Sequence, residues 1–128
     1  QELFNWFMNQ SGEVNGFSRS IWSGVTTLEL AKCIEYCIVE KIRGLKHLTS
    51  GSPISKYELL KEMNKQSGKD LLVNEIGGPV SNKALLPDND FFYSAPQNYE
   101  ELVRNMISDI RESEIYPHYV FSNSYGVQ

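Results

Sequence analysis

The sequence has little that would cross-link it, anchor it in a membrane or attract polyanions. Only two of its 128 residues are cysteines, so a disulfide scaffold is not expected. No apolar run is long enough to span a bilayer, and no stretch has the pattern of a signal peptide. The net charge of -4, from 12 basic and 16 acidic residues, argues against nucleic acid or a membrane surface as a partner. The expected compartment is the cytoplasm.

Signatures of catalysis are missing as well. The sequence contains no Gly-x-Gly-x-x-Gly or Gly-x-x-Gly-x-x-Gly dinucleotide loop and no Walker A loop, and Gly77-Gly78-Pro79 has the composition of a turn. The two histidines, His47 and His118, belong to no Ser/His/Asp arrangement. The chain alone lacks a complete catalytic apparatus, so whether it is an enzyme stays open, and no cofactor is expected within it.

What is present is the pattern of one soluble domain over residues 1–128, with 41% hydrophobic and 22% charged residues. Hydrophobic periodicity predicts an α/β fold, with α+β as the alternative: a small sheet with three to four flanking helices. Helices are expected over 2–10, 27–43 and 56–67 and from 99 onward, strands within 14–23, 45–49 and 70–76, an irregular loop over 77–96, and a tail over 114–128 that either docks or frays.

The predicted helices begin at recognisable caps. Thr26 with Glu29 and Ser55 with Glu58 form capping boxes, and Asn98 with Glu101 forms a third cap. The last helix carries an apolar stripe at i, i+3, i+4 and i+7. The second helix is expected to bury a stripe formed by Leu30, Ala31, Ile34, Cys37, Ile38 and Ile42, and to end at Gly44.

The first residues raise the question of what precedes them. The chain begins at Gln1, not Met, and its first segment already has the pattern of an apolar helix. This is expected of a fragment, an engineered piece or a processed product. Such a helix must pack against something, and its apolar residues are Leu3, Phe4, Trp6, Phe7 and Met8.

Two local patterns resemble chemistry but have simpler explanations. Tyr57 and Lys61 match the Tyr-x-x-x-Lys spacing of short-chain dehydrogenases, but the match is weak, and a half-buried tyrosine with a solvated lysine on a surface helix is the favoured explanation. Cys33 and Cys37, with the two histidines, lack zinc-ligand spacing. Buried free thiols are the expected state, and a small metal-dependent enzyme is the least favoured hypothesis.

Most of the candidate ligand contacts lie just before the second predicted helix, and one lies in the predicted loop over 77–96. Trp22, before a Ser23-Gly24 turn, offers a face on which a base or sugar can stack, and Arg19 and Lys83 can pair with phosphate. The alternatives are a packed aromatic for Trp22 and solvated surface charges for Arg19 and Lys83. We therefore expect substrate contacts at Arg19, Trp22, Ser23, Gly24 and Lys83, with no catalytic and no metal-binding residue.

Three blocks, in order and correctly spaced, resemble the C-terminal part of extended short-chain dehydrogenase/reductases. They are Trp22–Lys32 (WSGVTTLELAK), Gly44–Leu48 (GLKHL) and Ile54–Leu60 (ISKYELL). The sequence is most similar to the dTDP-4-dehydrorhamnose reductase-like proteins, which modify sugar nucleotides in polysaccharide biosynthesis, and the similarity covers Leu3 to about Ile110.

The resemblance implies a division of labour. In that family an N-terminal Rossmann domain carries the NAD(P) loop and the catalytic Tyr/Lys pair, and the C-terminal part supplies the nucleotide-sugar pocket. This chain would be the substrate-binding part, with the Rossmann domain absent and Tyr57 and Lys61 outside the catalytic pair. Lys46 replaces a tyrosine usual in the family, and Asn82-Lys83 replaces an Asp-Arg pair whose arginine faces the nucleotide. Lys83 keeps the charge but loses the bidentate fork.

The alternative is a stand-alone, non-catalytic interaction module. Its homodimer or partner surface would be the apolar face of the first helix, formed by Leu3, Phe4, Trp6 and Phe7.

Overall fold

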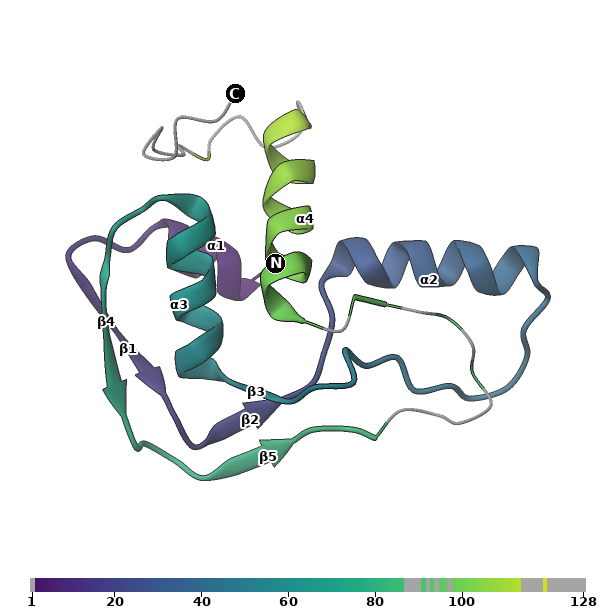
Figure 1. Ribbon diagram of the computed structural model, residues 1–128, viewed down its shortest axis with the longest axis horizontal. Coiled ribbons are helices and arrows are strands. Elements are labelled where there is room, and N and C mark those ends of the chain that lie inside the picture. The colour runs from purple at the N-terminus through teal and green to yellow at the C-terminus, as the bar shows by residue number, and fades with distance from the viewer. Residues whose placement is uncertain are drawn as a thin grey trace.

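The computed structural model describes residues 2–86, 91, 93, 95, 96, 98–113 and 119. The helices and strands of this part of the chain confirm the predicted mixed architecture, with small sheets and flanking helices (Figure 1). In chain order they are α1 (Glu2–Met8), β1 (Glu13–Phe17), β2 (Ser20–Trp22), α2 (Thr27–Val39), β3 (Ile54–Ser55), α3 (Lys56–Ser67), β4 (Leu72–Ile76), β5 (Ser81–Lys83) and α4 (Tyr99–Glu112). The tail over 114–128 lies outside the described residues, apart from Tyr119.

Two segments distant in sequence run side by side and form both sheets. β1 pairs in parallel with β4, from Glu13 opposite Leu72 to Phe17 opposite Ile76. β2 then pairs in parallel with β5, and β3 joins the other edge of β2 in antiparallel orientation. Between the two pairs, residues 18–19 on one segment are matched by the longer stretch 77–80 on the other, and the two sheets are separated there. The predicted extended segment over 14–23 is thus two strands, and the predicted loop over 77–96 contains β5.

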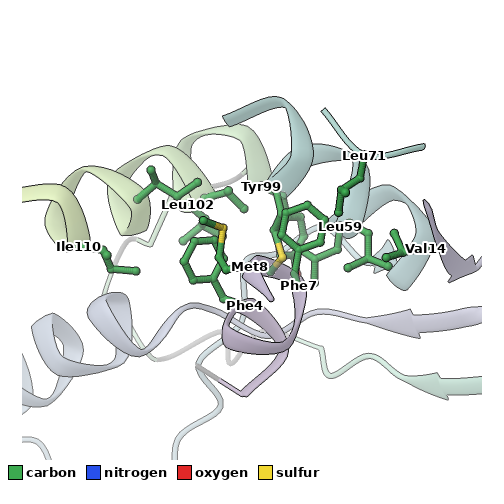
Figure 2. Packing of buried hydrophobic residues seen from close by; sticks show 13 residues of the cluster. Phe4, Phe7, Met8, Val14, Leu59, Leu71, Tyr99, Leu102 and Ile110 are labelled. Atoms are coloured by element: carbon green, nitrogen blue, oxygen red, sulfur yellow. The ribbon is translucent and has the colours of Figure 1, made fainter. Parts of the chain in front are cut away.

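The core lies between α1, α3 and α4 (Figure 2). The most completely buried apolar side chains are Phe7, Leu102 and Val103, at 0%, 0% and 1% exposure. The stripe predicted on the last helix, formed by Tyr99, Leu102, Val103, Met106, Ile107 and Ile110, is confirmed: Met106 is partly buried against the core and the other five are buried. α3 contacts α4 on one side and β1 and β4 on the other, so it connects the helices to the sheets.

The first helix belongs to this core. Phe4 is 3% exposed and Phe7 is fully buried, whereas Trp6 is 43% exposed. The apolar face that the alternative hypothesis assigned to a dimer or partner is therefore filled by the chain itself. Its expectation of an exposed Leu3, Phe4, Trp6 and Phe7 surface is wrong, because α3 and α4 supply the packing partner.

The three predicted N-caps are confirmed. The side chains of Thr26, Ser55 and Asn98 accept hydrogen bonds from the backbone N–H three residues on, at 3.3, 3.1 and 2.8 Å. α3 ends where predicted, with Gly68 in the left-handed conformation at φ +68°. α2 ends earlier than predicted, at Val39. After the helix, Lys41 at φ +55° is the first residue with a positive φ, three positions before the predicted Gly44.

Two other expectations are wrong. Residues 45–49 form no strand; the side chain of Leu45 is 88% exposed, and this segment has no neighbouring strand to pair with in the described part of the chain. The stripe expected to be buried on α2 is largely exposed, with Leu30 at 46%, Ile34 at 51% and Ile38 at 72%. Periodicity identified the apolar face correctly but not what covers it.

Gly16 should be intolerant of any side chain. A Cβ there would lie 2.6 Å from Cα of Tyr57, because the first turn of α3 sits directly on β1. We expect Gly16→Ala to lower the free energy of unfolding by about 1–3 kcal/mol through overpacking, measured by urea denaturation. The matched control is Gly77→Ala, whose added methyl would meet nothing closer than 3.8 Å. Equal effects of the two substitutions would contradict the close approach.

Candidate functional site

A cavity of about 330 Å³ opens between the core helices and the three-stranded sheet. Its volume is within the range of small-molecule sites. Most of its lining is apolar, and its polar members come from the beginnings of α2 and α3. The lining residues are Leu3, Phe4, Trp22, Val25, Thr26, Thr27, Ile54, Ser55, Lys56, Leu59, Met63, Tyr99, Val103 and Met106. Among the residues predicted to contact substrate, Trp22 is the one that lines it.

Trp22 is both a core residue and a cavity wall. Its indole packs 5.9 Å from the ring of Tyr99 and contacts the apolar core cluster, while the residue is only half-buried. A Cβ on Gly24 would lie 2.0 Å from the indole, so only glycine leaves room for this ring position. Gly24 therefore positions the tryptophan through its lack of a side chain.

The Ser23 hydroxyl is occupied by hydrogen bonds within the fold. The residue is 2% exposed, and its hydroxyl accepts from the backbone N–H of Leu85 at 2.8 Å and donates to the carbonyl of Leu85 at 3.2 Å. These bonds continue the β2–β5 pairing beyond Lys83, because they use both backbone groups of Leu85. Ser23 thus fixes the segment that follows β5 against the end of β2.

Lys83 and Arg19 lie at opposite ends of the β2–β5 pair. Lys83 is exposed and is the register partner of Trp22, so both side chains leave the same face of the sheet. Arg19 precedes β2; its carbonyl accepts from Ser81 N–H at 3.1 Å, and its guanidinium lies beside Gly77. Arg19 is three residue steps before Trp22, a distance of about 10 Å in extended chain. The fold brings Trp22 and Lys83 together and places Arg19 in the turn at the other end of the strand pair.

Tyr99 is buried and organises the turn after Trp22. The sequence predicts it only as a member of the apolar helix stripe. The hydroxyl of Tyr99 donates to the carbonyl of Gly24 at 2.9 Å and lies 2.9 Å from the hydroxyl of Ser50. Ser50 is fully buried, and its N–H donates to the carbonyl of Ser23 at 3.1 Å. No local pattern marks this network; a tyrosine at the first position of an apolar helix is its one sequence signal.

The remaining candidates have structural roles. The ammonium of Lys61 lies 5.1 Å from the ring centre of Tyr57 and pairs with Glu58 at 3.8 Å, as expected of a surface helix. Cys33 is buried and Cys37 partly buried, both as free thiols. The described residues contain no cluster of three or more potential metal ligands. His47 has its Nδ1 3.4 Å from the carbonyl of Leu86, and His118 lies outside the described residues.

Glu29, in the first turn of α2, is a buried acidic residue. The residue is 3% exposed; its carboxylate accepts from Tyr93 Oη at 2.9 Å and from Lys32 Nζ at 3.4 Å. It therefore does not serve the reciprocal capping bond predicted from the sequence. Burial and the hydrogen bond to this carboxylate raise the pKa of Tyr93 to about 12.

Alkaline pH should destabilise the fold through Cys33. Burial, aided by its hydrogen bond with Cys37, raises the pKa of the Cys33 thiol to about 11. The unfolded thiol titrates near pH 8.5, whereas the folded one keeps its proton up to about pH 11. The free energy of unfolding is therefore at its full value below pH 8.5 and falls as pH rises toward 11. We expect a loss of about 2–3 kcal/mol, measured as urea midpoints from pH 7 to 10.5. Cys33→Ala should show a flatter pH profile; an unchanged slope would contradict the assignment.

Comparison with solved structures gives the fold. dTDP-4-dehydrorhamnose reductase from Bacillus anthracis, in complex with NADP, matches with a TM-score of 0.69 at 14% identity, over 84% of this chain and 41% of that chain. The reductase of Clostridium acetobutylicum matches at 0.66 and 18%, over 86% and 43%. WbmH of Bordetella bronchiseptica, in complex with NAD+, matches at 0.59 and 17%, over 86% and 39%.

The chain shares its fold with part of these enzymes. The resemblance read from the three sequence blocks is confirmed at this level. The chain spans less than half the length of the solved structures it matches. No protein-family model matches it, and no curated protein matches it in sequence. In the part of the chain that the structure describes, no helix is long and apolar enough to cross a membrane.

Proposed function

We propose that this chain is the nucleotide-sugar-binding part of an NAD(P)-dependent sugar-nucleotide reductase or epimerase of polysaccharide biosynthesis. The observation that carries the proposal is the fold likeness over 84–86% of the chain to enzymes of this kind, two of them bound to NADP or NAD+. The three sequence blocks add support, because they fall on the β2–α2 turn, the return segment after α2 and the β3–α3 start.

The ligand would lie along the β2–β5 edge. Trp22 would offer its ring to the base or sugar, and Lys83, beside it in register, would neutralise the diphosphate. Arg19, in the turn before β2 and about 10 Å from Trp22, would have to reach around the end of the strand pair to contact a second group on the same ligand. Ser23 and Gly24 would contribute by shape: one holds the Leu85 segment in place, and the other makes room for the indole.

Hydride chemistry belongs to the rest of the enzyme. NAD(P) would need a glycine-rich loop at the start of a helix, where backbone N–H groups meet the diphosphate. Gly77 and Gly78 lie between β4 and β5, not at a helix start, so the described residues do not fit this cofactor. The cofactor site and the Tyr/Lys proton donor would come from a Rossmann domain in the same protein.

The test is the complete open reading frame that encodes this chain. We expect it to encode a Gly-x-x-Gly-x-x-Gly loop and a Tyr-x-x-x-Lys pair outside these 128 residues. Its product should oxidise NADH or NADPH, followed at 340 nm, when given a keto-sugar nucleotide, or interconvert epimers of a nucleotide-sugar. A reading frame without a cofactor loop, or a product inactive with every dTDP-, UDP- and GDP-sugar, contradicts the proposal.

A further inference from the structure

One side of α2 is covered by the chain's own loop. Glu29 and Cys33 are 3% and 5% exposed, and the ring of Tyr36 lies 5.5 Å from that of Tyr93. These residues recur every three or four positions, so they share one face of the helix. Beyond this contact α2 extends away from α1, α3 and α4 (Figure 1).

The neighbouring face of α2 is apolar and open. Leu30, Ile34 and Ile38, spaced at i, i+4 and i+8, form a stripe about 12 Å long; their exposed fractions are 46%, 51% and 72%. The stripe leads into a hollow of about 390 Å³ lined by Ile34, Cys37, Ile38, Lys41, Ile42 and Arg43. Its lining combines apolar side chains with two basic residues, Lys41 and Arg43. A contiguous exposed apolar surface with a polar rim is typical of an interaction site.

The length of the matched enzymes indicates what covers the stripe. The matched enzymes are more than twice the length of the matched region, and two of them hold a dinucleotide. Resting on the proposed function, we infer that the α2 stripe is the surface on which the dinucleotide-binding domain of the same protein docks. Lys41 and Arg43 would then lie at the edge of the domain junction.

The size of the surface favours a linked domain over a second copy. A stable interface between separate chains takes about 20–30 residues a side, and the stripe with its hollow offers far fewer. A domain on the same polypeptide needs less contact area, because the linkage already supplies an effective concentration of about millimolar.

The test is the reactivity of a cysteine placed on the stripe. Ile38→Cys, in a Cys37→Ser background, is compared in the 128-residue chain and in the product of the complete reading frame. The reagent is a maleimide at pH 7, where the buried Cys33 thiol is protonated because burial raises its pKa to about 11. We expect labelling at least about tenfold slower in the longer protein. Leu72→Cys, at an exposed position on β4, is the control and should react equally in both.

The outcomes separate this inference from the proposed function. A longer protein that turns over a nucleotide-sugar but labels Ile38→Cys as fast as the isolated chain overturns the docking surface alone. Protection that disappears on dilution identifies a second copy as the occupant and also overturns it. A reading frame with no second domain overturns both.

Discussion

Replacing Phe7 by alanine should lower the free energy of unfolding by about 3–5 kcal/mol. The side chain is fully buried in the core cluster, and Figure 2 shows it beside Leu59, which is itself 5% exposed. Buried neighbours relax little toward a void, so the cavity cost adds to the lost transfer free energy. Urea denaturation followed by far-UV circular dichroism measures the effect; if the variant does not fold, Phe7→Leu gives a smaller loss that can be measured.

Trp6 is the matched control in the same helix. Its side chain is 43% exposed, so Trp6→Ala should cost less than about 1 kcal/mol. The pair also tests how the first helix is used. If Trp6→Ala and Phe7→Ala both left a folded monomer of wild-type stability while abolishing a dimer, the helix would be an interface and not part of the core.

Removing the Trp22 ring should weaken nucleotide-sugar binding by about 1–3 kcal/mol, the value of stacking a base on an aromatic side chain. The ring lines the cavity and is held over Gly24, so its orientation is set before a ligand arrives. Because Trp22 also packs against Tyr99, Trp22→Phe is needed beside Trp22→Ala. We expect the phenylalanine variant to retain the stability of the wild type and part of its affinity, measured by calorimetric titration.

Lys83 provides a second test on the neighbouring strand. It is exposed on an edge strand, so Lys83→Ala should leave stability unchanged and weaken binding about tenfold. Lys83→Arg should bind at least as tightly as the wild type, because a guanidinium can hold phosphate through two hydrogen bonds. Lys65→Ala removes a comparably exposed charge on α3 and should change nothing. Equal losses from the Lys83 and Lys65 variants would refute a phosphate role.

The sequence predicted best what depends on neighbouring residues. Thr26, Ser55 and Asn98 cap their helices as expected, and Gly68 ends α3, because these bonds join positions only a few residues apart. The stripe on α4 was equally legible, since its period is unbroken over four turns. The resemblance to the reductases rested on three short blocks, and the fold bears it out.

Where prediction failed, the missing information was the partner. The periodicity of Leu30, Ile34 and Ile38 shows an apolar face, but a sequence cannot tell whether the covering surface belongs to the same chain. Residues 45–49 have a strand-like composition, yet a strand exists only beside another, and in the described structure none pairs with them.

The site shows the same limit. Trp22 and Lys83 were found separately, 61 residues apart, and only the register of β2 with β5 made them neighbours. Ser23 was expected to contact substrate, but its hydroxyl bonds to Leu85. The role of Tyr99 in holding Gly24 and Ser50 depends on contacts 75 and 49 residues away in sequence. Long-range pairing of this kind leaves no local trace.

The most direct measurement is an NMR titration of the 128-residue chain with dTDP-, UDP- and GDP-sugars, following the indole N–H signals of its two tryptophans. Trp22 lines the cavity, whereas Trp6 projects from α1 and serves as an internal reference. We predict that at least one nucleotide-sugar shifts the Trp22 signal saturably and leaves the Trp6 signal unchanged. The free sugar should not shift the Trp22 signal. If no nucleotide-sugar moves Trp22, or if both signals move together, this chain is not the nucleotide-sugar-binding part of such an enzyme.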